Sequence, residues 1–527
     1  MSLSNLAQVA VHDGANADID AVWKAQSTSL RIDPASGKQE LVLVGMILFL
    51  YLLLNVFTAD RYPFPFFDEA FYTDPAVNYV KGHGFTANVP GEDLPVFYFY
   101  NGPAHPALLI PWLKIFGVSM RSVRSINFAY MAITMLLVWS AAKRLGLVIL
   151  PRWRLLLVSM LICDYSVICS YRCGRYDCLG MLVVAFAFWS FSFKSSALRL
   201  AALAFAGAAS PWIGVQLLPL EAMLGITLLA FALFRYWQEV VAFFLGIAAG
   251  GLGLIRFFTS HGVLQDFLRF VHSPTKGFWF VGGLLRGEFR HSNTLPKDFS
   301  LPLVLGSAVL LAVALYAKGS LRLRSPLIYG LIFVPLLGLT LVLAAHFPTY
   351  YGWMTYVPLA VCVCASLNSN VPVSLRRIAV GLCVVASIIG VGLHVLACAR
   401  DWKDRDYSKL QQFVTSNIKS DDQAYIDPQA YYPAKLTGAT TFFWDPGSRM
   451  SSTQKTRLTV CVIGPDRIGL LKDFGGAWYR TGQEMIPAHT GLFGIDMKWG
   501  FLSLPNYRLS IYRRVPIAET WSAGAAD

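Results

Sequence analysis

The chain has 527 residues, of which 55% are hydrophobic and only 14% are charged, and its formal net charge at pH 7 is +13. A soluble protein of this length needs more charged surface than this composition supplies, so we expect a membrane protein with many helical spans. The excess of lysine and arginine is typical of cytoplasmic loops. It does not indicate nucleic-acid binding, since no basic helix stands on a soluble domain.

The beginning of the chain is polar and has no apolar core of the kind found in a cleavable signal peptide. We expect residues 1–40 to form a cytoplasmic tail. A transmembrane region over residues 41–400 should follow, with long outer loops at residues 59–120 and 259–300. Residues 401–527 are predicted to form a small extracytoplasmic α/β domain.

Eleven segments are apolar and long enough to cross a bilayer, for which about 20 residues are needed. Lysines and arginines are concentrated in the short loops that lie inside when the N-terminus is inside, which satisfies the positive-inside rule. An odd number of spans then places the C-terminal region outside. The predicted spans are Leu41–Thr58, Arg121–Ala142, Leu155–Tyr171, Cys178–Phe193, Leu198–Gly214, Val215–Phe234, Val240–Phe258, Leu301–Ala317, Pro326–Ala345, Trp353–Leu367 and Ile378–Ala399.

The C-terminal region has the mixed pattern of an α/β domain. An amphipathic helix is predicted over Tyr407–Lys419, and strand-like runs follow at Gln423–Asp427, Leu458–Ile463 and Tyr507–Arg514. The region has neither a glycine-rich phosphate loop nor a nucleophile elbow. Contact with an acceptor, a lid and a stabilising appendage all remain open as its role.

Two adjacent acids, Asp68 and Glu69, stand among aromatic residues directly after the first span. Ionisable groups at a membrane boundary are costly unless they have a function, although a solvated loop with aromatic anchors is the alternative. A carboxylate here can remove a proton from a hydroxyl, or Asp68 can merely cap a helix over Glu69–Thr73. Asp74 is predicted to cap a helix that runs from Pro75 to Gly82.

Charges also crowd the short turn between the third and fourth spans, in the sequence SYRCGRYDCLG (Ser170–Gly180). Arg172 and Arg175 can bind an anion while Asp177 orients them, or Arg175 and Asp177 can form a purely structural salt bridge. Whether Cys173 and Cys178 form a disulfide is left open, because the sequence does not supply the geometry.

The second outer loop also carries a positive balance. Arg269, His272 and Lys276 are among its cationic side chains. Such a balance fits an anionic ligand such as a lipid phosphate, although surface solvation explains any one of these groups.

The predicted cytoplasmic segments are too short to contain a nucleotide-sugar or ATP-binding domain, which requires a βαβ pattern. If the protein uses an activated donor, that donor must therefore arrive dissolved in the membrane.

As a set, the outer motifs resemble those of GT-C-type membrane glycosyltransferases, which use lipid-linked sugars. The resemblance covers the region from residue 41 to residue 400 and is greatest to bacterial protein O-mannosyltransferases and the lipid A aminoarabinose transferase. The motifs that carry it are Asp68-Glu69, HPALLIPWLKIFGVS (His105–Ser119), GRYD (Gly174–Asp177) and HFPTYYGWMTYVPLA (His346–Ala360).

The resemblance implies transfer of a sugar from a polyprenyl phosphate to an acceptor hydroxyl of an envelope glycolipid, polysaccharide or protein at the bacterial inner membrane. It implies that Asp68 is the general base or orients the acceptor, that Asp177 shapes the site, and that Glu69 is a neighbour of undefined role. The donor phosphate is expected to contact cationic side chains chosen from Arg172, Arg175, His105, Arg269, His272 and Lys276.

One motif departs from the family pattern. Family members often carry a metal-binding Glu followed by a phosphate-binding Lys, whereas this chain has Ala104 and His105 at those positions. No metal ligand is therefore assigned, and a divalent metal is in doubt. A contact between His105 and phosphate requires a protonated imidazole.

Two other classes remain as alternatives. One is an oligosaccharyltransferase or ligase that uses diphosphate-linked glycans, which tends to have a longer external domain or paired acidic metal ligands. The other is a lipid or sugar transporter or flippase, for which internal repeats and charges near the midplane are typical. Neither set of features is clear in the sequence.

Overall fold

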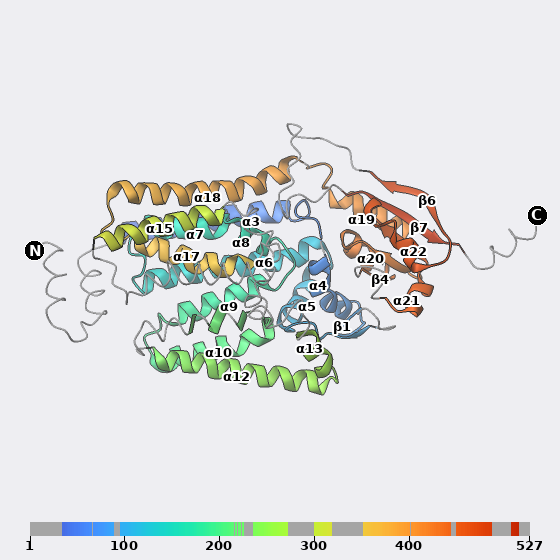
Figure 1. Cartoon of the computed structure of the whole chain (residues 1–527), viewed down its shortest axis with the longest axis horizontal. Helices are drawn as coiled ribbons and strands as arrows, with labels where there is room; N and C mark the ends of the chain where they lie inside the picture. The colour runs from blue at the N-terminus through green and yellow to red at the C-terminus, as the bar shows by residue number, and fades with distance from the viewer. Residues whose placement is uncertain are drawn as a thin grey trace, which may run out of the picture.

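The structure is a computed structural model that describes residues 34–65, 67–88, 95–215, 217–218, 220–222, 224–225, 236–271, 300–318, 351–400, 402–443, 450–486 and 507–515. Long helices lie side by side in a bundle, a smaller α/β unit lies at one end of that bundle, and α4 and α5 lie between the two (Figure 1).

Most predicted spans correspond to helices of the structure. Among the described residues, six helices are long and apolar enough to cross a membrane, or seven if one bent pair counts as a single span. A multi-pass helical membrane fold is therefore confirmed. The helices are α3 (Pro34–Thr58), α4 (Phe67–Val80), α5 (Ala104–Phe116), α6 (Met120–Arg144), α7 (Pro151–Cys163), α8 (Tyr165–Tyr171), α9 (Asp177–Ser190), α10 (Ser196–Ile213), α12 (Trp237–Ser260), α13 (Leu264–Val271), α15 (Ser300–Ala317), α17 (Trp353–Ser366) and α18 (Val373–Arg400).

The number of eleven spans stays a prediction. The predicted span at Pro326–Ala345 lies outside the described residues, and that at Val215–Phe234 lies mostly outside them.

The third predicted span is not one continuous helix, because α7 and α8 meet at an angle of 60°. Asp164 stands at the break with an extended backbone, and its carboxylate accepts hydrogen bonds from the backbone N–H of Val167 at 3.0 Å and the Ser300 hydroxyl at 2.7 Å. The side chain thus caps α8 and replaces part of the hydrogen bonding lost at the bend. Periodicity alone does not reveal such a break.

Helices α10 and α12 pack unusually closely through small residues. A Cβ atom placed on Gly246 or Gly250 would lie 2.1 Å from the carbonyl oxygen of Ala204 or Ala208, respectively. Only glycine permits this approach, which is typical of helix pairs in membranes.

The smaller unit contains a five-stranded sheet in the order β4-β3-β5-β7-β6. Strand β3 pairs in parallel with β4 and β5, whereas β7 pairs antiparallel with β5 and β6. The predicted helix and the three predicted strands coincide with α19, β3, β5 and β7. The elements are α19 (Tyr407–Asn417), β3 (Gln423–Ile426), the 3-10 helix η2 (Pro428–Ala430), α20 (Tyr431–Thr437), β4 (Thr440–Phe442), α21 (Ser452–Arg457), β5 (Val460–Ile463), η3 (Pro465–Arg467), α22 (Leu470–Phe474), β6 (Trp478–Met485) and β7 (Leu509–Arg514).

Between the bundle and this unit, a two-stranded antiparallel hairpin joins β1 (Thr86–Ala87) to β2 (Val96–Phe97) and follows α4. The predicted helix start at Pro75 is wrong, because α4 begins at Phe67 and contains Pro75. Asp74 does not cap a helix end: it is fully buried within α4, and its carboxylate meets Lys435 and Tyr431 of α20. These partners are remote in sequence, so a local capping argument misses them.

Candidate active site

The first turn of α4 carries both acids of the DE motif, and they face different partners. Asp68 forms an ion pair with Nη1 of Arg175, and its side chain is 26% exposed. Glu69 is fully buried and pairs with Arg124 instead. The two neighbouring carboxylates therefore belong to different environments.

Arg175 is the centre of the first environment, in the turn between α8 and α9. Its Nε donates to Oδ2 of Asp177 at 2.8 Å, and its Nη2 donates to the Tyr351 hydroxyl at 3.0 Å. Tyr351 in turn lies 2.9 Å from the Tyr176 hydroxyl, oxygen to oxygen. The structure thus brings together Asp68, Arg175 and Asp177, three of the predicted site residues, and adds Tyr351 from the late outer motif.

Two features hold the Arg175 turn against its neighbours. The side-chain amide of Asn127, from α6, donates to the carbonyls of Cys173 and Arg175, the latter at 2.8 Å. A Cβ atom on Gly174 would lie 2.4 Å from Cγ1 of Val123 and 2.9 Å from Cγ of Glu69. The glycine of the GRYD motif therefore lets the turn approach α4 closely enough for Arg175 to reach Asp68.

Aromatic rings enclose the Arg175 guanidinium. The ring centres of Tyr72 and Tyr176 lie 5.2 Å and 5.4 Å from its Cζ atom, within the range of cation–π attraction. The nearby Tyr98 hydroxyl is buried without a hydrogen-bond partner. Burial raises the pKa of Tyr98, so its hydroxyl stays protonated at neutral pH. Buried polar groups without partners are rare and costly, so the Tyr98 hydroxyl is a candidate contact for a polar ligand.

His105, near the start of α5, is fully buried, and its ring lies beside the backbone of Gly174. Burial lowers the pKa of His105 to about 4; the hydrogen bond with the Gly174 backbone opposes this shift, and the charge of Arg175 adds to it. The imidazole is therefore neutral at pH 7. The protonated contact with phosphate that the sequence suggested stays a prediction, and a neutral imidazole can also donate one hydrogen bond.

Glu69 occupies the second environment, where Arg124 of α6 holds it in a two-pronged ion pair. Nε of Arg124 lies 2.9 Å from Oε1, and Nη2 lies 2.7 Å from Oε2. The remaining nitrogen donates to the carbonyls of Ala59 and Pro63, each at 2.8 Å. Both side chains are fully buried. This geometry ties the start of α4 to the bundle and keeps Glu69 away from solvent.

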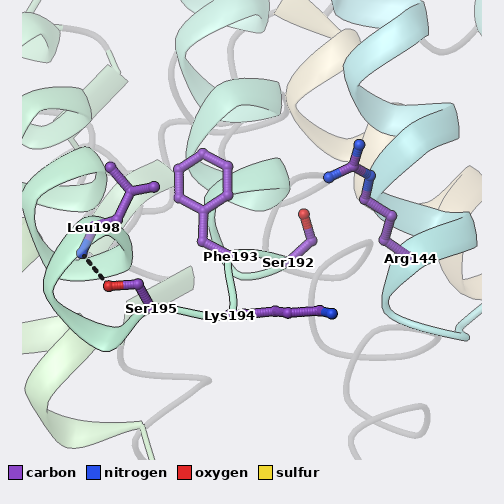
Figure 2. Close-up of a pocket in the computed structure, with 6 residues that line it drawn as sticks. All are labelled: Arg144, Ser192, Phe193, Lys194, Ser195 and Leu198. Atoms are coloured by element: carbon purple, nitrogen blue, oxygen red, sulfur yellow. Dashed lines mark hydrogen bonds between the residues drawn. The ribbon is translucent and has the colours of Figure 1, made fainter.

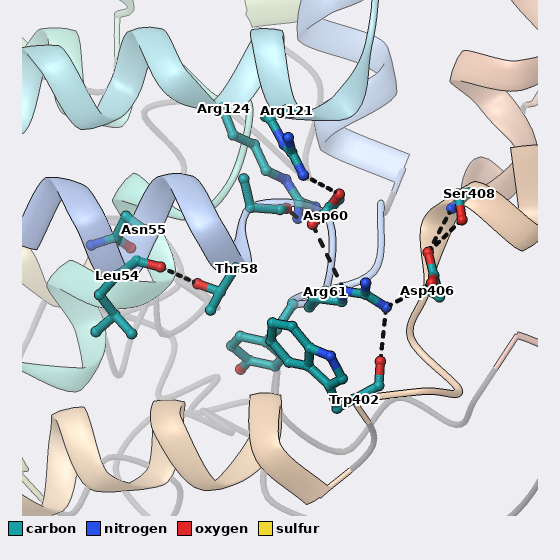
Figure 3. Close-up of polar contacts among 12 residues, drawn as sticks. Leu54, Asn55, Thr58, Asp60, Arg61, Arg121, Arg124, Trp402, Asp406 and Ser408 are labelled. Atoms are coloured by element: carbon teal, nitrogen blue, oxygen red, sulfur yellow. Dashed lines mark hydrogen bonds and ion pairs between the residues drawn. The ribbon is translucent and has the colours of Figure 1, made fainter.

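Arg172 has a structural environment rather than an open one. Its Nε donates to the carbonyl of Tyr62 at 3.0 Å, its Nη1 to the Thr58 hydroxyl at 2.8 Å, and its Nη2 to the Thr58 carbonyl at 2.5 Å. Figure 3 shows Asn55 and Thr58 at the end of α3, where these acceptors gather. All three guanidinium nitrogens are thus engaged, and a contact with donor phosphate would require these bonds to break.

The remaining predicted phosphate contacts come from the second outer loop. Arg269 lies on α13 with its side chain 79% exposed, and it pairs with Asp266 at 3.1 Å. His272 and Lys276 lie outside the described residues. Cys173 and Cys178 are separate buried thiols, so the disulfide that the sequence left open is not formed.

The donor atoms around Asp68 do not fit a divalent metal. Asp68 and Asp177 are both paired with the same cation, Arg175, and position 104 is an alanine. Within the described residues, no group of three or more His, Cys, Asp or Glu side chains is arranged to hold a metal ion.

A separate groove of about 510 Å³ lies at the opposite ends of α6 and α9 from Arg124 and Asp177. Figure 2 shows Arg144 and Lys194 at its edge, and Ser195 accepting a hydrogen bond from the backbone of Leu198. These residues belong to the loops predicted to be cytoplasmic, so the groove is not part of the Asp68 site.

The sequence reasoning missed several residues of the site. Arg124 lies within the predicted span Arg121–Ala142, and an arginine within an apolar segment is itself a signal of a buried partner. Asn127 carried a weaker form of the same signal. Tyr98 carried no signal that separates it from membrane-interface aromatics, whereas Tyr351 lies within the motif His346–Ala360.

The comparisons with known proteins agree with the fold. No protein-family profile matches the sequence, and no curated protein matches it. Among solved structures, ArnT from Cupriavidus metallidurans bound to undecaprenyl phosphate has a TM-score of 0.57 and 12% identity, covering 90% of this chain and 98% of that chain. The chain therefore has the GT-C fold of this membrane glycosyltransferase, which confirms the fold that the motif resemblance implied.

Two further structures show weaker similarity. The oligosaccharyltransferase of Archaeoglobus fulgidus has a TM-score of 0.49 and 11% identity, covering 82% of this chain and 71% of that chain. The mycobacterial arabinofuranosyltransferase AftD has a TM-score of 0.45 and 14% identity, covering 89% of this chain and 40% of that chain.

Proposed function

We propose that this chain is an integral-membrane glycosyltransferase that moves a sugar from a polyprenyl phosphate to an acceptor hydroxyl. The observation that carries the proposal is a partly exposed carboxylate, Asp68, paired with the buried Arg175 at one end of a GT-C helix bundle. By the positive-inside argument, this end faces the extracytoplasmic side of a bacterial inner membrane, with the N-terminal tail in the cytoplasm.

In the proposed reaction, Asp68 accepts the proton of the acceptor hydroxyl while the hydroxyl oxygen attacks the anomeric carbon of the sugar. The bond between that carbon and the phosphate oxygen breaks, the configuration inverts, and polyprenyl phosphate leaves with the bonding electron pair. General-base catalysis of this kind contributes about 10²- to 10⁴-fold.

Arg175 has two tasks in this reaction. In the free enzyme it orients Asp68, and as the donor binds it stabilises the negative charge that develops on the departing phosphate. Such preorganised stabilisation is usually the largest single contribution to catalysis. Asp177 fixes the Nε side of the guanidinium, which leaves the Nη side toward Asp68 and Tyr351. Neutral groups, namely Tyr98 and His105, are proposed to bind the sugar or the phosphate by hydrogen bonds.

The lipid nature of the donor is supported by the similarity in fold to ArnT, whose structure contains undecaprenyl phosphate. Because the donor atoms around Asp68 do not suit a divalent metal, we propose that transfer does not depend on one. Activity that disappears in a chelator and returns with Mg²⁺ or Mn²⁺ would contradict this part of the proposal.

The function is tested with the full-length protein in vesicles and a polyprenyl-phosphate sugar that carries a radiolabel in the sugar. We expect the label to leave the lipid fraction in the presence of envelope lipids or proteins, and free polyprenyl phosphate to appear. Movement of intact donor across the bilayer without cleavage would instead indicate a transporter. Cleavage of only diphosphate-linked glycans would indicate an oligosaccharyltransferase or ligase.

A further inference from the structure

The C-terminal unit contacts the helix that carries Asp68, and its contacts fall on both sequence neighbours of that residue. The ring of Phe67 lies 6.0 Å from the ring of Phe443, centre to centre. On the other side, the Tyr432 hydroxyl donates to Oε1 of Glu69 at 3.3 Å. Asp68 itself stays partly exposed between these two anchored positions.

Further along α4, the contact becomes an ion pair. Nζ of Lys435 lies 2.8 Å from Oδ1 of Asp74 and 2.8 Å from Oδ1 of Asn78. The Tyr431 hydroxyl donates to the same Asp74 oxygen at 2.5 Å. All four side chains are buried. Breaking a buried ion pair leaves an uncompensated buried charge, which lowers the stability of the fold. The pair between Asp74 and Lys435 therefore holds α4 and α20 together.

The second oxygen of Asp74 extends this contact to the outer loop. It accepts hydrogen bonds from the backbone N–H of Asn88 at 3.1 Å and the side chain of Asn78 at 3.2 Å. The amide of Asn88 then donates to the carbonyl of Thr441 in β4 at 2.5 Å. Helix α4 is therefore fixed by the C-terminal unit through two routes.

The C-terminal unit is also fixed where it leaves the bundle. Arg61, just after α3, donates to the carbonyl of Trp402 at 2.8 Å and forms an ion pair with Asp406 at 3.2 Å. Figure 3 shows Asp406 between Arg61 and Ser408. The Asp406 carboxylate accepts a hydrogen bond from the backbone N–H of Ser408 at 3.1 Å. The C-terminal unit is thus held both at its connection to the bundle and along α4, so that α20 can transmit a fixed position to α4.

We propose that Tyr432 and Lys435 are positioning residues, which act through Glu69 and Asp74 to set the place of Asp68 beside Arg175. The role of the C-terminal unit is then to complete the active site rather than only to stabilise the fold. This inference rests on the proposed function for its kinetic consequence, while its structural consequence, the immobilisation of α4, stands independently.

The test compares Lys435→Met and Tyr432→Phe with Lys472→Met, which removes an exposed lysine of the same unit at α22. In the first two variants, we expect faster amide hydrogen exchange in peptides that cover α4 and unchanged exchange in α6. A misplacement of about 1 Å can lower the rate about 100-fold, so kcat should fall by about 10- to 100-fold while the KM for donor lipid changes little. Lys472→Met should match the wild type in both measurements.

A double variant separates positioning from general destabilisation. If Lys435 acts through Asp74, Lys435→Met combined with Asp74→Asn should exchange more slowly in α4 than Lys435→Met alone, because no uncompensated charge remains. Should Lys435→Met fail to fold, Tyr432→Phe removes one hydroxyl and carries the same test. Unchanged α4 exchange together with wild-type kcat in Tyr432→Phe and Lys435→Met would overturn the inference. A wild-type protein that transfers no sugar would overturn the proposed function, whereas the exchange result would still decide the positioning of α4.

Discussion

Asp68 and Glu69 are consecutive residues, each paired with an arginine, yet their surroundings differ in almost every other respect. Glu69 is fully buried and held by both prongs of Arg124, and it also accepts from Tyr432 of the C-terminal unit. Asp68 is 26% exposed and pairs with Nη1 of Arg175. The comparison teaches that one acid of the motif holds the helix in place and the other is left accessible for chemistry.

The two arginines show the same division. The third nitrogen of Arg124, Nη1, donates hydrogen bonds to two backbone carbonyls, so this side chain has a structural role. Arg175 donates hydrogen bonds from Nε and Nη2 to the side chains of Asp177 and Tyr351. Side-chain partners can rearrange as a ligand binds, whereas the carbonyls of Ala59 and Pro63, in the segment after α3, can do so only if the backbone moves.

The largest expected effect comes from breaking the buried pair. Arg124→Met leaves the buried Glu69 without its charged partner, and removal of one member of such a pair typically costs about 3–5 kcal/mol in the free energy of unfolding. Thermal unfolding in detergent should show a clear drop in midpoint. Arg121→Met is the matched control, because Arg121 lies on the same helix with its side chain 54% exposed. Equal midpoints for the two variants would contradict the structural role of the Arg124 pair.

The next effect concerns pH. Burial lowers the pKa of His105 from 6.5 to about 4, so the unfolded chain binds a proton there at a higher pH than the folded chain. Stability must therefore be lost as the pH falls from about 6.5 to about 4, by about 3 kcal/mol in total. His105→Leu should lose less stability over this range than the wild type. His83→Leu, at an exposed position, should behave as the wild type, and parallel pH curves for all three proteins would argue against a buried neutral imidazole.

The smallest effect is expected at the exposed cation of α13. Arg269 pairs with Asp266 at the surface, and pairs of this kind contribute only about 0–1 kcal/mol. Arg269→Gln should therefore leave the unfolding midpoint close to that of the wild type. The predicted contact of Arg269 with the donor phosphate is tested by enzyme kinetics. If the contact exists, Arg269→Gln should have a higher KM for donor lipid than the wild type. An unchanged KM would show that Arg269 is not part of the site.

The sequence was informative where chemistry is local. Apolar stretches predicted the spans that became α6, α12 and α18, and the short motifs predicted that Asp68, Arg175 and Asp177 belong together. Period-two patterns likewise predicted β3, β5 and β7. These predictions are correct because the length of an apolar stretch and the alternation of a strand depend on one segment of the sequence alone.

The rest depends on contacts between distant segments. Asp74 looked like a helix cap because Pro75 follows it, but Lys435, 361 positions later in the sequence, determines its role. Arg172 looked like Arg175 in sequence, and only the carbonyls at the end of α3 distinguish the two. Tyr432 and Tyr351 are ordinary aromatics until the fold places their hydroxyls beside Glu69 and Arg175.

The central claim is that the two acids of the motif have different tasks, and one pair of variants tests it directly. Sugar transfer from a polyprenyl phosphate and thermal unfolding should be measured for Asp68→Asn and Glu69→Gln in the same preparation. We predict that Asp68→Asn unfolds near the wild-type midpoint but transfers sugar about 10²- to 10⁴-fold more slowly, whereas Glu69→Gln lowers the midpoint. Full transfer activity in Asp68→Asn would contradict the account.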